Sequence, residues 1–502
     1  MRGNQVIMIS YDVVVIGGGL LGCFALRSLM RYDVNAALFE GREDLCTGIS
    51  RANTAIVYSG CDTKPGTLKT EMCVRSAQHM GELCRELGVR YSRCGSLMVS
   101  FGPRGDSSLR RKYELGLANG VREIRLLSGR ETLEIEPGLA ENVTLALYVR
   151  DTGTVNPWEL CLAAAESAIA NGAHLRLKTE VTGVKEMQGG YCVTAGGADY
   201  FTCGIINCAG QNADTVHEMA AEPIVRIIPS EGDYLVLDTK VLGAINHIIF
   251  HEPEERAKGL TLVPTIDGNI LVGPTERDFC GEEHFASSRE GMEVLHNLAA
   301  QVVPSLPMEH VIRGFGTMRP NPFHVLRDER GKYTLSDRSI NDFCIICPEE
   351  VPRLISLIGI KTPGLTCSNE LGLRASDMMA GMLGLAGRKG FRRQPKAPVR
   401  VNKLSFEERS ELVRKNPAYG RIVCRCREIS EGEIVDAVRR CPGAVTIDGV
   451  KRRTCATSGR CQGSFCTQRI IEIIANETGR LPENIEKDAT GSYIIKGGSD
   501  GI

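Results

Sequence analysis

The sequence predicts a mixed α/β fold (α+β class) with a small additional domain toward the C-terminus. Three observations lead to this prediction. An apolar strand, three glycines and a helical pattern follow one another near the N-terminus, strand-like and helical segments then alternate as far as residue 385, and two close pairs of cysteines lie beyond residue 420. At 502 residues the chain is long for one compact domain, so two or three domains are expected.

The first motif lies in the segment YDVVVIGGGLLGCFALRSLM. An apolar run, Val13–Ile16, leads into Gly17, Gly19 and Gly22 in GxGxxG spacing, and a helical pattern follows. Glycines let the backbone turn sharply and approach a pyrophosphate, whose charge is favoured at a helix N-terminus. The next apolar run ends in Glu40, 23 residues after Gly17, where a carboxylate can accept hydrogen bonds from a ribose. These features favour a Rossmann-like dinucleotide-binding domain over a glycine-rich turn beside a surface glutamate.

The later segments alternate between helix and strand patterns. WELCLAAAESAIANG (158–172) has the apolar spacing of a helix that ends at glycine, and a short strand is expected near 175–181. FTCGIINCAGQNAD predicts a strand that ends at Ala209 and Gly210, a turn of small residues that lets the backbone pass close to a cofactor. YLVLDT, LTLVPTIDGNILVGPT and FCIICP alternate like strands of a second, mixed or antiparallel sheet, which we expect to face the substrate.

Four cysteines near the C-terminus indicate a metal centre. Cys424 and Cys426 are spaced C-x-C, Cys461 and Cys466 are spaced C-x4-C, and 34 residues separate the pairs. Thiolates are soft ligands that bind iron-sulfur clusters or zinc. Zinc pairs are usually spaced C-x2-C, so this spacing is unusual for zinc. It resembles the [2Fe-2S] module of the bacterioferritin-associated-ferredoxin type, which favours a cluster over zinc, and a metal over plain core cysteines. The segment is short for an independent core, so a metal would stabilise it.

Composition excludes several classes of protein. With 60 basic and 61 acidic residues the net charge is −1, so no global field attracts nucleic acid or an anionic membrane. The 20 cysteines are scattered, which indicates reduced residues in a cytoplasmic protein rather than a disulfide scaffold. No apolar run approaches the roughly 20 residues that span a bilayer. We expect no transmembrane segment, while peripheral membrane association stays open.

With these residues in view, the chain resembles the D-amino-acid-oxidase-like FAD oxidoreductases. More narrowly, it is similar to the group of glycerol-3-phosphate dehydrogenase A-subunits and L-2-hydroxyglutarate dehydrogenases that carries a C-terminal module of the bacterioferritin-associated-ferredoxin type. The resemblance covers nearly the whole chain. The matching motifs are VVVIGGGLLG, TGISRANTAIVYSG with KPGTLK, TGTVNPWEL, INCAGQNAD, KGLTLVPTIDGNILVGPT, FGTMRP, LIGIKTPGLTCS and NPAYGRIVCRCREISEGEI.

The resemblance implies a division of the chain and a location for each cofactor. Residues 10–385 would form the FAD-dependent oxidoreductase domain, 386–420 a basic linker, 421–485 the [2Fe-2S]-binding domain and 486–502 a tail. A helix that begins after Pro363 and Gly364 would aim N–H groups at the flavin and stabilise its reduced form. The implied FAD-binding residues are Gly17, Gly19, Gly22, Glu40, Thr47, Ser50, Asn53, Thr54, Val181, Ala209, Gly210, Gly359, Pro363, Gly364, Leu365 and Thr366. The implied cluster ligands are Cys424, Cys426, Cys461 and Cys466.

Several residues bear on the substrate or depart from the family pattern. Arg319 matches an arginine that binds the substrate's anionic group in related enzymes, and a surface salt bridge is the alternative. Tyr58 stands where relatives commonly have histidine, and a phenol with a normal pKa near 10 is a poorer proton acceptor. Lys361 would stabilise anionic flavin or hold a substrate carboxylate, or else be solvated. Glu231 stands where arginine is frequent, and Cys455 is expected to be a non-ligand because relatives tend to have a basic residue there.

The implied function is oxidation of a small anionic hydroxy substrate, of the glycerol 3-phosphate or 2-hydroxy acid type, by hydride transfer to FAD. Electrons would pass through the [2Fe-2S] cluster to an electron-accepting flavoprotein or iron-sulfur partner. Two alternatives stay open. One is an amine or amino-acid dehydrogenase of the same fold. The other is a non-catalytic electron-transfer subunit of a multi-subunit flavoprotein complex, which the replacement of histidine by Tyr58 favours.

Overall fold

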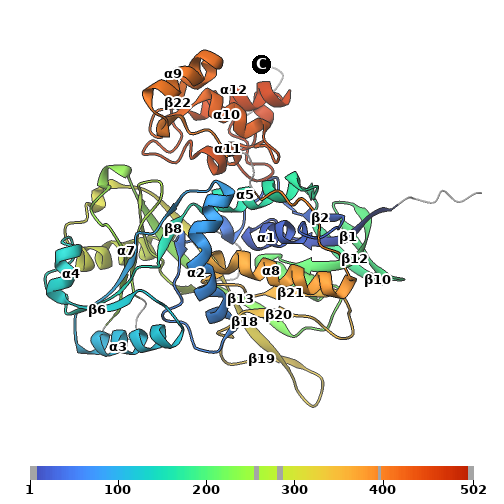
Figure 1. Cartoon of the computed structure of the whole chain (residues 1–502), viewed down its shortest axis with the longest axis horizontal. Coiled ribbons are helices and arrows are strands. Elements are labelled where there is room, and N and C mark those ends of the chain that lie inside the picture. The colour runs from blue at the N-terminus through green and yellow to red at the C-terminus, as the bar shows by residue number, and fades with distance from the viewer. Residues whose placement is uncertain (1–7, 254–258, 280–285, 394–396, 496–502) are drawn as a thin grey trace, which may run out of the picture.

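The computed structural model describes residues 8–253, 259–279, 286–393 and 397–495. Within these ranges the chain forms a large body of sheets and helices, and a smaller helical body, the C-terminal body, packs against it (Figure 1). The mixed α/β class predicted from the sequence is confirmed.

The first sheet of the large body contains the predicted dinucleotide-binding unit. Strand β1 (Ile9–Ile16) lies at its centre and pairs in parallel with β2 (Ala36–Phe39) and with β12 (Ala198–Asn207). The inner residues of β1 and all of β2 are buried, as is usual for parallel strands covered on both faces. The described part of this sheet also contains β9 (His174–Arg176), β10 (Val181–Met187), β11 (Gly190–Ala195), β20 (Cys344–Ile346) and β21 (Leu354–Ile358).

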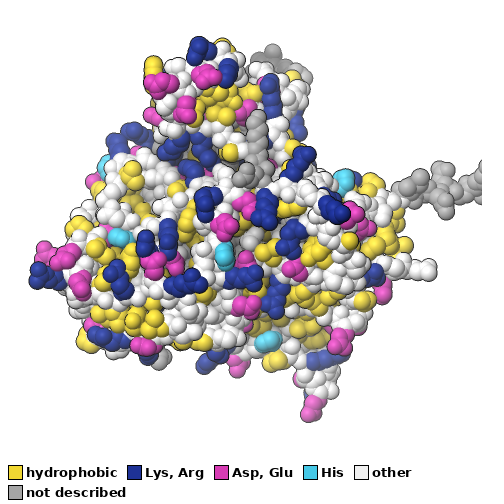
Figure 2. All heavy atoms as spheres, viewed as in Figure 1, with side chains coloured by type: hydrophobic (Ala, Val, Ile, Leu, Met, Phe, Trp, Pro, Cys, Tyr) yellow, Lys and Arg dark blue, Asp and Glu magenta, His cyan; other side chains and the backbone are white. Residues whose placement is uncertain are grey.

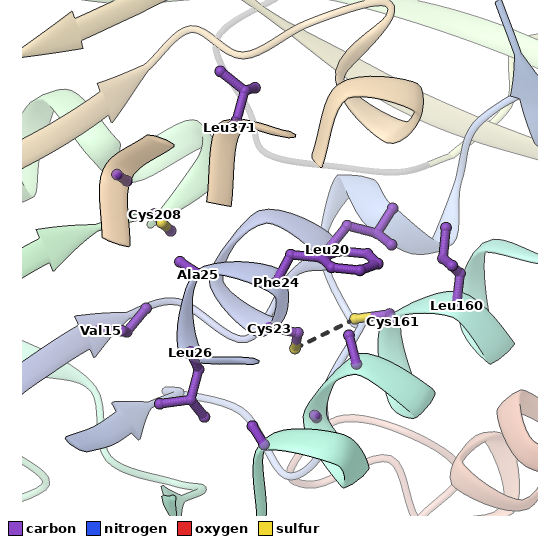
Figure 3. Packing of buried hydrophobic residues seen from close by; sticks show 14 of the residues in the cluster. Val15, Leu20, Cys23, Phe24, Ala25, Leu26, Leu160, Cys161, Cys208 and Leu371 are labelled. Carbon is purple, nitrogen blue, oxygen red and sulfur yellow. Dashed lines mark hydrogen bonds between the residues drawn. The ribbon is translucent and has the colours of Figure 1, made fainter. Parts of the chain in front are cut away.

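Helix α1 (Leu20–Leu29) follows β1 and is buried on almost every side, between α5 (Pro157–Ala170) and α8 (Gly364–Leu383). An apolar helix of this kind belongs in the interior of a large domain. Figure 3 shows Cys23 of α1 facing Cys161 of α5, with their sulfur atoms 3.6 Å apart. The sequence predicted α5 to within two residues at each end and the beginning of α8 to within one residue.

A second, larger sheet forms the other half of the large body. Its two long strands, β13 (Val225–Leu237) and β18 (Val311–Arg327), pair antiparallel along their lengths and set Ser230 opposite Arg319. Most of its other pairings are also antiparallel, as predicted, although β14 and β5 run parallel. Its other described strands are β5 (Ser96–Ser100), β6 (Ile124–Ser128), β7 (Leu145–Val149), β14 (Ile248–His251), β15 (Thr261–Pro264), β16 (Ile270–Val272), β17 (Arg277–Asp278) and β19 (Tyr333–Leu335).

One strand assignment from the sequence was wrong. FCIICP was expected in the second sheet, but β20 pairs antiparallel with β21 of the first sheet, with Cys344 opposite Ile358. Alternation of apolar residues predicts a strand. It does not identify the partner of a strand as short as this one, because three residues carry little information about pairing.

The C-terminal body is built around isoleucines contributed by its hairpin and helices. The buried core includes Ile434, Ile447, Ile470 and Ile474. Its elements are β22 (Ile422–Cys424), β23 (Ile429–Ser430), α10 (Glu431–Arg439), α11 (Ile447–Thr454) and α12 (Thr467–Thr478). The exposed helix α9 (Phe406–Lys415) precedes it, and α11 lies next to α5 of the large body (Figure 1).

The remaining described elements complete the large body. They are α2 (Leu68–Leu87), α3 (Pro103–Ala118), α4 (Gly129–Ile135), α6 (Ala213–His217), α7 (Arg289–Val302) and the three-stranded sheet of β3 (Ile56–Val57), β4 (Tyr91–Ser92) and β8 (Gly153–Val155). In the part of the chain that the structure describes, none of the helices combines the length and the apolar character needed to cross a membrane.

Candidate active site and metal centre

A cleft with a volume of about 450 Å³ is lined by the glycine turn after β1, residues 47–54, the middles of β13 and β18 and the beginning of α8. This volume is within the range of small-molecule sites. The cleft brings together most residues proposed from the sequence, namely Gly17, Gly19, Glu40, Thr47, Ser50, Asn53, Thr54, Tyr58, Ala209, Gly210, Arg319, Lys361, Pro363, Gly364 and Leu365. The proposed residues that do not line it are Gly22, Val181, Gly359 and Thr366.

The glycine turn needs glycine for two different reasons. Gly17 has φ +105°, and a Cβ there would lie 2.4 Å from the Cys208 carbonyl oxygen. A Cβ at Gly22 would lie 1.9 Å from the Gly17 carbonyl oxygen. Gly22 therefore acts from behind the cleft, because it lets α1 begin directly against the turn.

Glu40 lies at the carboxyl end of β2 and turns its carboxylate toward the glycines. One carboxylate oxygen accepts a hydrogen bond from the Gly18 N–H (2.7 Å) and the other from the Arg42 N–H (2.9 Å). Burial raises the pKa of the Glu40 carboxyl. This is the arrangement in which an acidic side chain can meet a ribose beside the dinucleotide turn.

The loop over residues 47–54 crosses the N-terminus of α1. The Ser50 hydroxyl accepts a hydrogen bond from the Leu20 N–H (3.0 Å), which satisfies one of the free donors of that helix end. Asn53 fixes the loop, because its amide donates to the Ser50 carbonyl (2.9 Å) and accepts from the Ala55 N–H (2.8 Å). The loop and the helix N-terminus together form a surface suited to a pyrophosphate.

Thr366 and Gly359 support the cleft from behind. The Thr366 hydroxyl accepts from the Tyr58 N–H (3.0 Å) and donates to the Ile56 carbonyl (3.4 Å), which ties β3 to the first turn of α8. Gly359 has φ +66°, and a Cβ there would lie 2.5 Å from the Pro322 side chain. Both residues set the position of the N-terminus of α8. This helix begins at Gly364, which lines the cleft, so the positive end of the helix dipole faces the cleft.

Tyr58 lines the cleft and packs against Phe250, with ring centroids 5.9 Å apart. Burial raises the pKa of the Tyr58 phenol, so the phenol is protonated at neutral pH. It can therefore position a substrate hydroxyl by hydrogen bonding, but it is a poor proton acceptor.

Lys361 is held in place rather than freely solvated. Its ammonium donates to the Asn321 side-chain oxygen (3.2 Å) and to the Ser339 hydroxyl (3.4 Å). Burial, reinforced by the positive charges of Lys69 and Arg319, lowers the pKa of Lys361 to about 8. The positive charges of Lys69 and Arg319 therefore both act on Lys361, although of the three only Arg319 and Lys361 line the cleft.

Arg319 lines the cleft from β18 and is about one-third exposed, with a guanidinium nitrogen 3.8 Å from the Glu276 carboxylate. The distance is too long and the side chains are too exposed for a strong ion pair.

Sequence reasoning missed Lys69, which is buried on α2 and donates to the Asn341 side-chain oxygen (3.2 Å). Its one sequence signal was its position in the KPGTLK motif.

Glu231, which stands where related proteins frequently have arginine, is paired with an arginine from another strand. Its carboxylate accepts from Arg277 of β17 at 2.6 Å, and Arg277 also donates to Asp233 at 2.7 Å. Both acids are buried. The arginine compensates their charge, because a buried carboxylate without a partner is costly.

The four proposed cluster ligands lie together as two pairs. The Cys426 and Cys461 sulfur atoms are 3.6 Å apart, and a hydrogen bond with Cys466 lowers the pKa of Cys424 to about 6. Among the residues that the structure describes, no three of these sulfur atoms lie within 4.8 Å of one another. A single zinc ion, with Zn–S bonds of about 2.3 Å, would draw all four sulfurs close together. Two separate pairs fit a two-iron cluster better.

Cys455, which was expected to be a non-ligand, contacts the large body through its sulfur. Its sulfur lies 3.6 Å from an Asp267 carboxylate oxygen and 3.7 Å from the Asn156 amide nitrogen, both in the large body. Cys455, Glu159 and Asp267 do group their ligand atoms within 4.8 Å, but Arg90 already pairs with both carboxylates. The arginine, rather than a cation, therefore balances this group.

Buried ion pairs join the two bodies. Asp44 is 2% exposed and accepts from Arg452 and Arg453, each at 2.8 Å. Burial alone would raise the pKa of Asp44, but the two guanidiniums overcome it and hold the pKa at about 2. Figure 2 shows Lys and Arg side chains gathered where the C-terminal body meets the large one.

Two protein families match the chain. The FAD dependent oxidoreductase family matches residues 12–378, and the BFD-like [2Fe-2S] binding domain matches residues 422–476. A glycerol 3-phosphate dehydrogenase of Caloramator mitchellensis is 37% identical over 97% of this chain and 98% of that protein. The human mitochondrial L-2-hydroxyglutarate dehydrogenase is 29% identical over 53% of this chain and 60% of that protein.

Solved structures show the same architecture. Dithionite-reduced L-α-glycerophosphate oxidase of Mycoplasma pneumoniae with FAD bound superposes with a TM-score of 0.69 at 25% identity, covering 77% of this chain and 98% of that one. Glycine oxidase of Geobacillus kaustophilus has a TM-score of 0.64 at 21% identity, covering 78% and 99%. The second likeness concerns the fold alone.

Proposed function

Because the chain belongs to the FAD-dependent oxidoreductase family and carries a BFD-like [2Fe-2S] binding domain, we propose that it oxidises a small anionic hydroxy compound and relays the electrons through the cluster to a partner protein. The family resemblance and the two cofactors predicted from the sequence, FAD and a [2Fe-2S] cluster, are confirmed. The substrate, the relay and the partner are the proposed part.

Glycerol 3-phosphate is the substrate that we favour, and 2-hydroxy acids are the next candidates. A relative that shares almost the full length of this chain is a glycerol 3-phosphate dehydrogenase, and shorter matches are L-2-hydroxyglutarate dehydrogenases. Both named substrates combine a hydroxyl-bearing carbon with an anionic group. The amine alternative is supported by a likeness of fold only.

The observation that carries the substrate proposal is the group of cations formed by Lys69, Arg319 and Lys361. Burial, and after it the positive charges of Lys69 and Arg319, lower the pKa of Lys361 to about 8. A bound phosphate or carboxylate would relieve this repulsion, and the planar donors of arginine suit either group. We therefore assign the anion-binding role to Arg319 and Lys361, both of which line the cleft.

Bound FAD supplies the hydride acceptor. Arg319 and Lys361 would hold the anionic end of the substrate, and Tyr58, which also lines the cleft, would orient its hydroxyl group. Because burial raises the pKa of Tyr58, we propose that the hydroxyl proton leaves to water rather than to this side chain. The α8 N-terminus favours negative charge at the same end of the cleft.

The partner protein would dock where the cluster loop reaches the surface. Phe465, next to the ligand Cys466, is 85% exposed, and the exposed Arg425 and Arg460 precede the ligands Cys426 and Cys461. An exposed aromatic side chain and exposed cations next to the ligands in sequence favour an electron-carrying protein with an apolar contact and an acidic rim. Cytoplasmic location is part of the proposal and rests on the reduced, scattered thiols.

A dye-reduction assay with the purified, FAD-loaded protein tests the substrate class. We expect glycerol 3-phosphate or a 2-hydroxy acid to reduce the dye under anaerobic conditions, and glycine or proline to be inactive. Activity with the amines alone would replace the proposal by the amine-dehydrogenase alternative. Inactivity with every donor would favour a non-catalytic electron-transfer subunit.

A further inference from the structure

The segment after the predicted [2Fe-2S]-binding domain takes part in the dinucleotide cleft. Asp488 and Ala489 line the same cleft as the glycine turn and Glu40. From the sequence this segment was expected to be only a tail. It lies beyond residues 422–476, where the BFD-like domain matches, and more than 100 residues beyond the oxidoreductase match that ends at 378.

The tail contacts the large body at two points, one before the 47–54 loop and one within it. Asp488 is ion-paired with Arg51, at the end of the short helix η1 (Ile49–Arg51). The Thr490 hydroxyl donates to the Glu43 carboxylate. Glu43 and Arg51 both line the cleft. The tail therefore contacts residues on both sides of Ser50, whose hydroxyl accepts a hydrogen bond from the Leu20 N–H at the beginning of α1.

The C-terminal body fixes the tail in this position. Arg452 of α11 donates to Asp488 at 2.7 Å and to the buried Asp44 at 2.8 Å. Arg51, Asp488, Arg452 and Asp44 therefore form one continuous chain of opposite charges from the cleft to the interface between the bodies. Within the tail, the Asp488 N–H donates to the Ser492 hydroxyl at 3.0 Å, which shapes the turn.

We propose that residues 488–490 form an outer wall of the FAD site, so that the docked C-terminal body retains the dinucleotide. Asp488 holds Arg51 beside the helix end where the pyrophosphate charge is favoured. Release of FAD then requires the tail to leave Arg51 and Glu43. The proposal rests on FAD binding and not on the identity of the substrate, so it can fail while the proposed reaction stands.

The test is the rate of FAD release from the full-length protein, followed by the rise in flavin fluorescence after dilution. Asp488→Asn removes the charge that holds Arg51, and we expect release at least about tenfold faster, the effect of losing one charge-assisted contact. Thr490→Val removes only the hydroxyl that binds Glu43, and we expect a smaller acceleration of about threefold. Cluster absorbance is recorded in parallel and should be unchanged.

Glu477→Gln is the matched control. Glu477 is ion-paired with Arg439 inside the C-terminal body, and its side chain is 18% exposed, against 16% for Asp488. Release from this variant should equal that of the wild type. Wild-type release rates in both tail variants would overturn the proposal, and so would an equal acceleration in Glu477→Gln. If Asp488→Asn loses its cluster, the release rate of Thr490→Val is the test: faster release supports the proposal, and the wild-type rate overturns it.

Discussion

At the scale of single residues, Lys361 is the side chain whose chemistry depends most on its surroundings. Burial and the charges of Lys69 and Arg319 lower its pKa to about 8. Its ammonium is therefore charged at neutral pH and loses its proton in a range accessible to kinetics. An anion-binding role and a proton-accepting role predict opposite pH dependences, because the first needs the charged form and the second the neutral form.

We predict that kcat/KM for an anionic hydroxy substrate falls as pH rises through about 8, because Lys361 then loses its positive charge. Lys361→Arg keeps the charge at high pH and should move the fall to higher pH. The measurement is a steady-state pH profile of both proteins. A rate that rises through the same pH would assign the neutral amine as proton acceptor and contradict the anion-binding role.

Arg319→Leu should lower kcat/KM by roughly 10- to 150-fold, since charge-assisted hydrogen bonds are worth about 1.5–3 kcal/mol. The effect should appear mainly in KM. Arg327→Leu is the control, because Arg327 is an exposed arginine at the end of the same strand. Equal kinetics in the wild type and Arg319→Leu would leave the surface salt bridge as the better account of Arg319.

At the scale of elements, the glycine turn and the two helices that begin at the cleft are the most predictable part of the molecule. The turn needs glycine because backbone atoms lie within 2.4 Å of a Cβ at Gly17 or Gly22. The contact at Gly22 lies within one strand–helix unit, and the positive φ of Gly17 is a property of its own backbone, so a pattern of residues can indicate both. The contact between Gly17 and Cys208 joins distant parts of the chain and depends on the rest of the fold.

Gly22→Ala should destabilise the protein by about 1–3 kcal/mol or more, because the added Cβ would overlap the Gly17 carbonyl oxygen. It should also lower the amount of bound flavin. Thermal unfolding and the flavin released on denaturation measure both effects. Gly381→Ala is the control, because nothing lies within 4 Å of a Cβ at that position and Gly381 does not line the cleft. Equal losses in both variants would contradict the close-contact account.

The features that could not be predicted depend on contacts between distant parts of the chain. Local alternation indicated that 343–348 contains a strand, but β20 joins the first sheet, and only the tertiary fold decides that pairing. Lys69 reaches the cationic group from α2, and Arg277 compensates Glu231 from a neighbouring strand. Asp488 enters the cleft from the far end of the chain. In each case the sequence contains both residues but does not indicate that they lie in contact.

At the scale of the whole molecule, Asp44 links the stability of the interface to pH. Its pKa is about 2 in the folded protein against 3.8 ordinarily, so its ionisation contributes about 2 kcal/mol of stability above pH ~4. This contribution is lost as pH falls from ~4 to ~2. Asp44→Asn should lower the free energy of unfolding at neutral pH by about 3–5 kcal/mol, since Arg452 and Arg453 lose a buried partner.

Urea unfolding at neutral pH and at pH ~3 checks both parts of this prediction. The variant should lose less stability on acidification than the wild type, because the titrating group has been removed. Glu134→Gln, which breaks the exposed pair with Arg130, should change stability by less than about 1 kcal/mol. Identical acid sensitivity in the wild type and Asp44→Asn would contradict the assigned role of Asp44.

The central claim is that electrons from a hydroxy substrate reach the [2Fe-2S] cluster through the flavin of the same chain. The most direct measurement is an anaerobic titration of the purified protein with glycerol 3-phosphate, in which the visible flavin band and the electron paramagnetic resonance of the cluster are followed together. We predict that the substrate bleaches the flavin and that the signal of a reduced cluster then appears. Bleaching without a cluster signal would contradict the relay, and no bleaching by any hydroxy donor would contradict the proposed reaction.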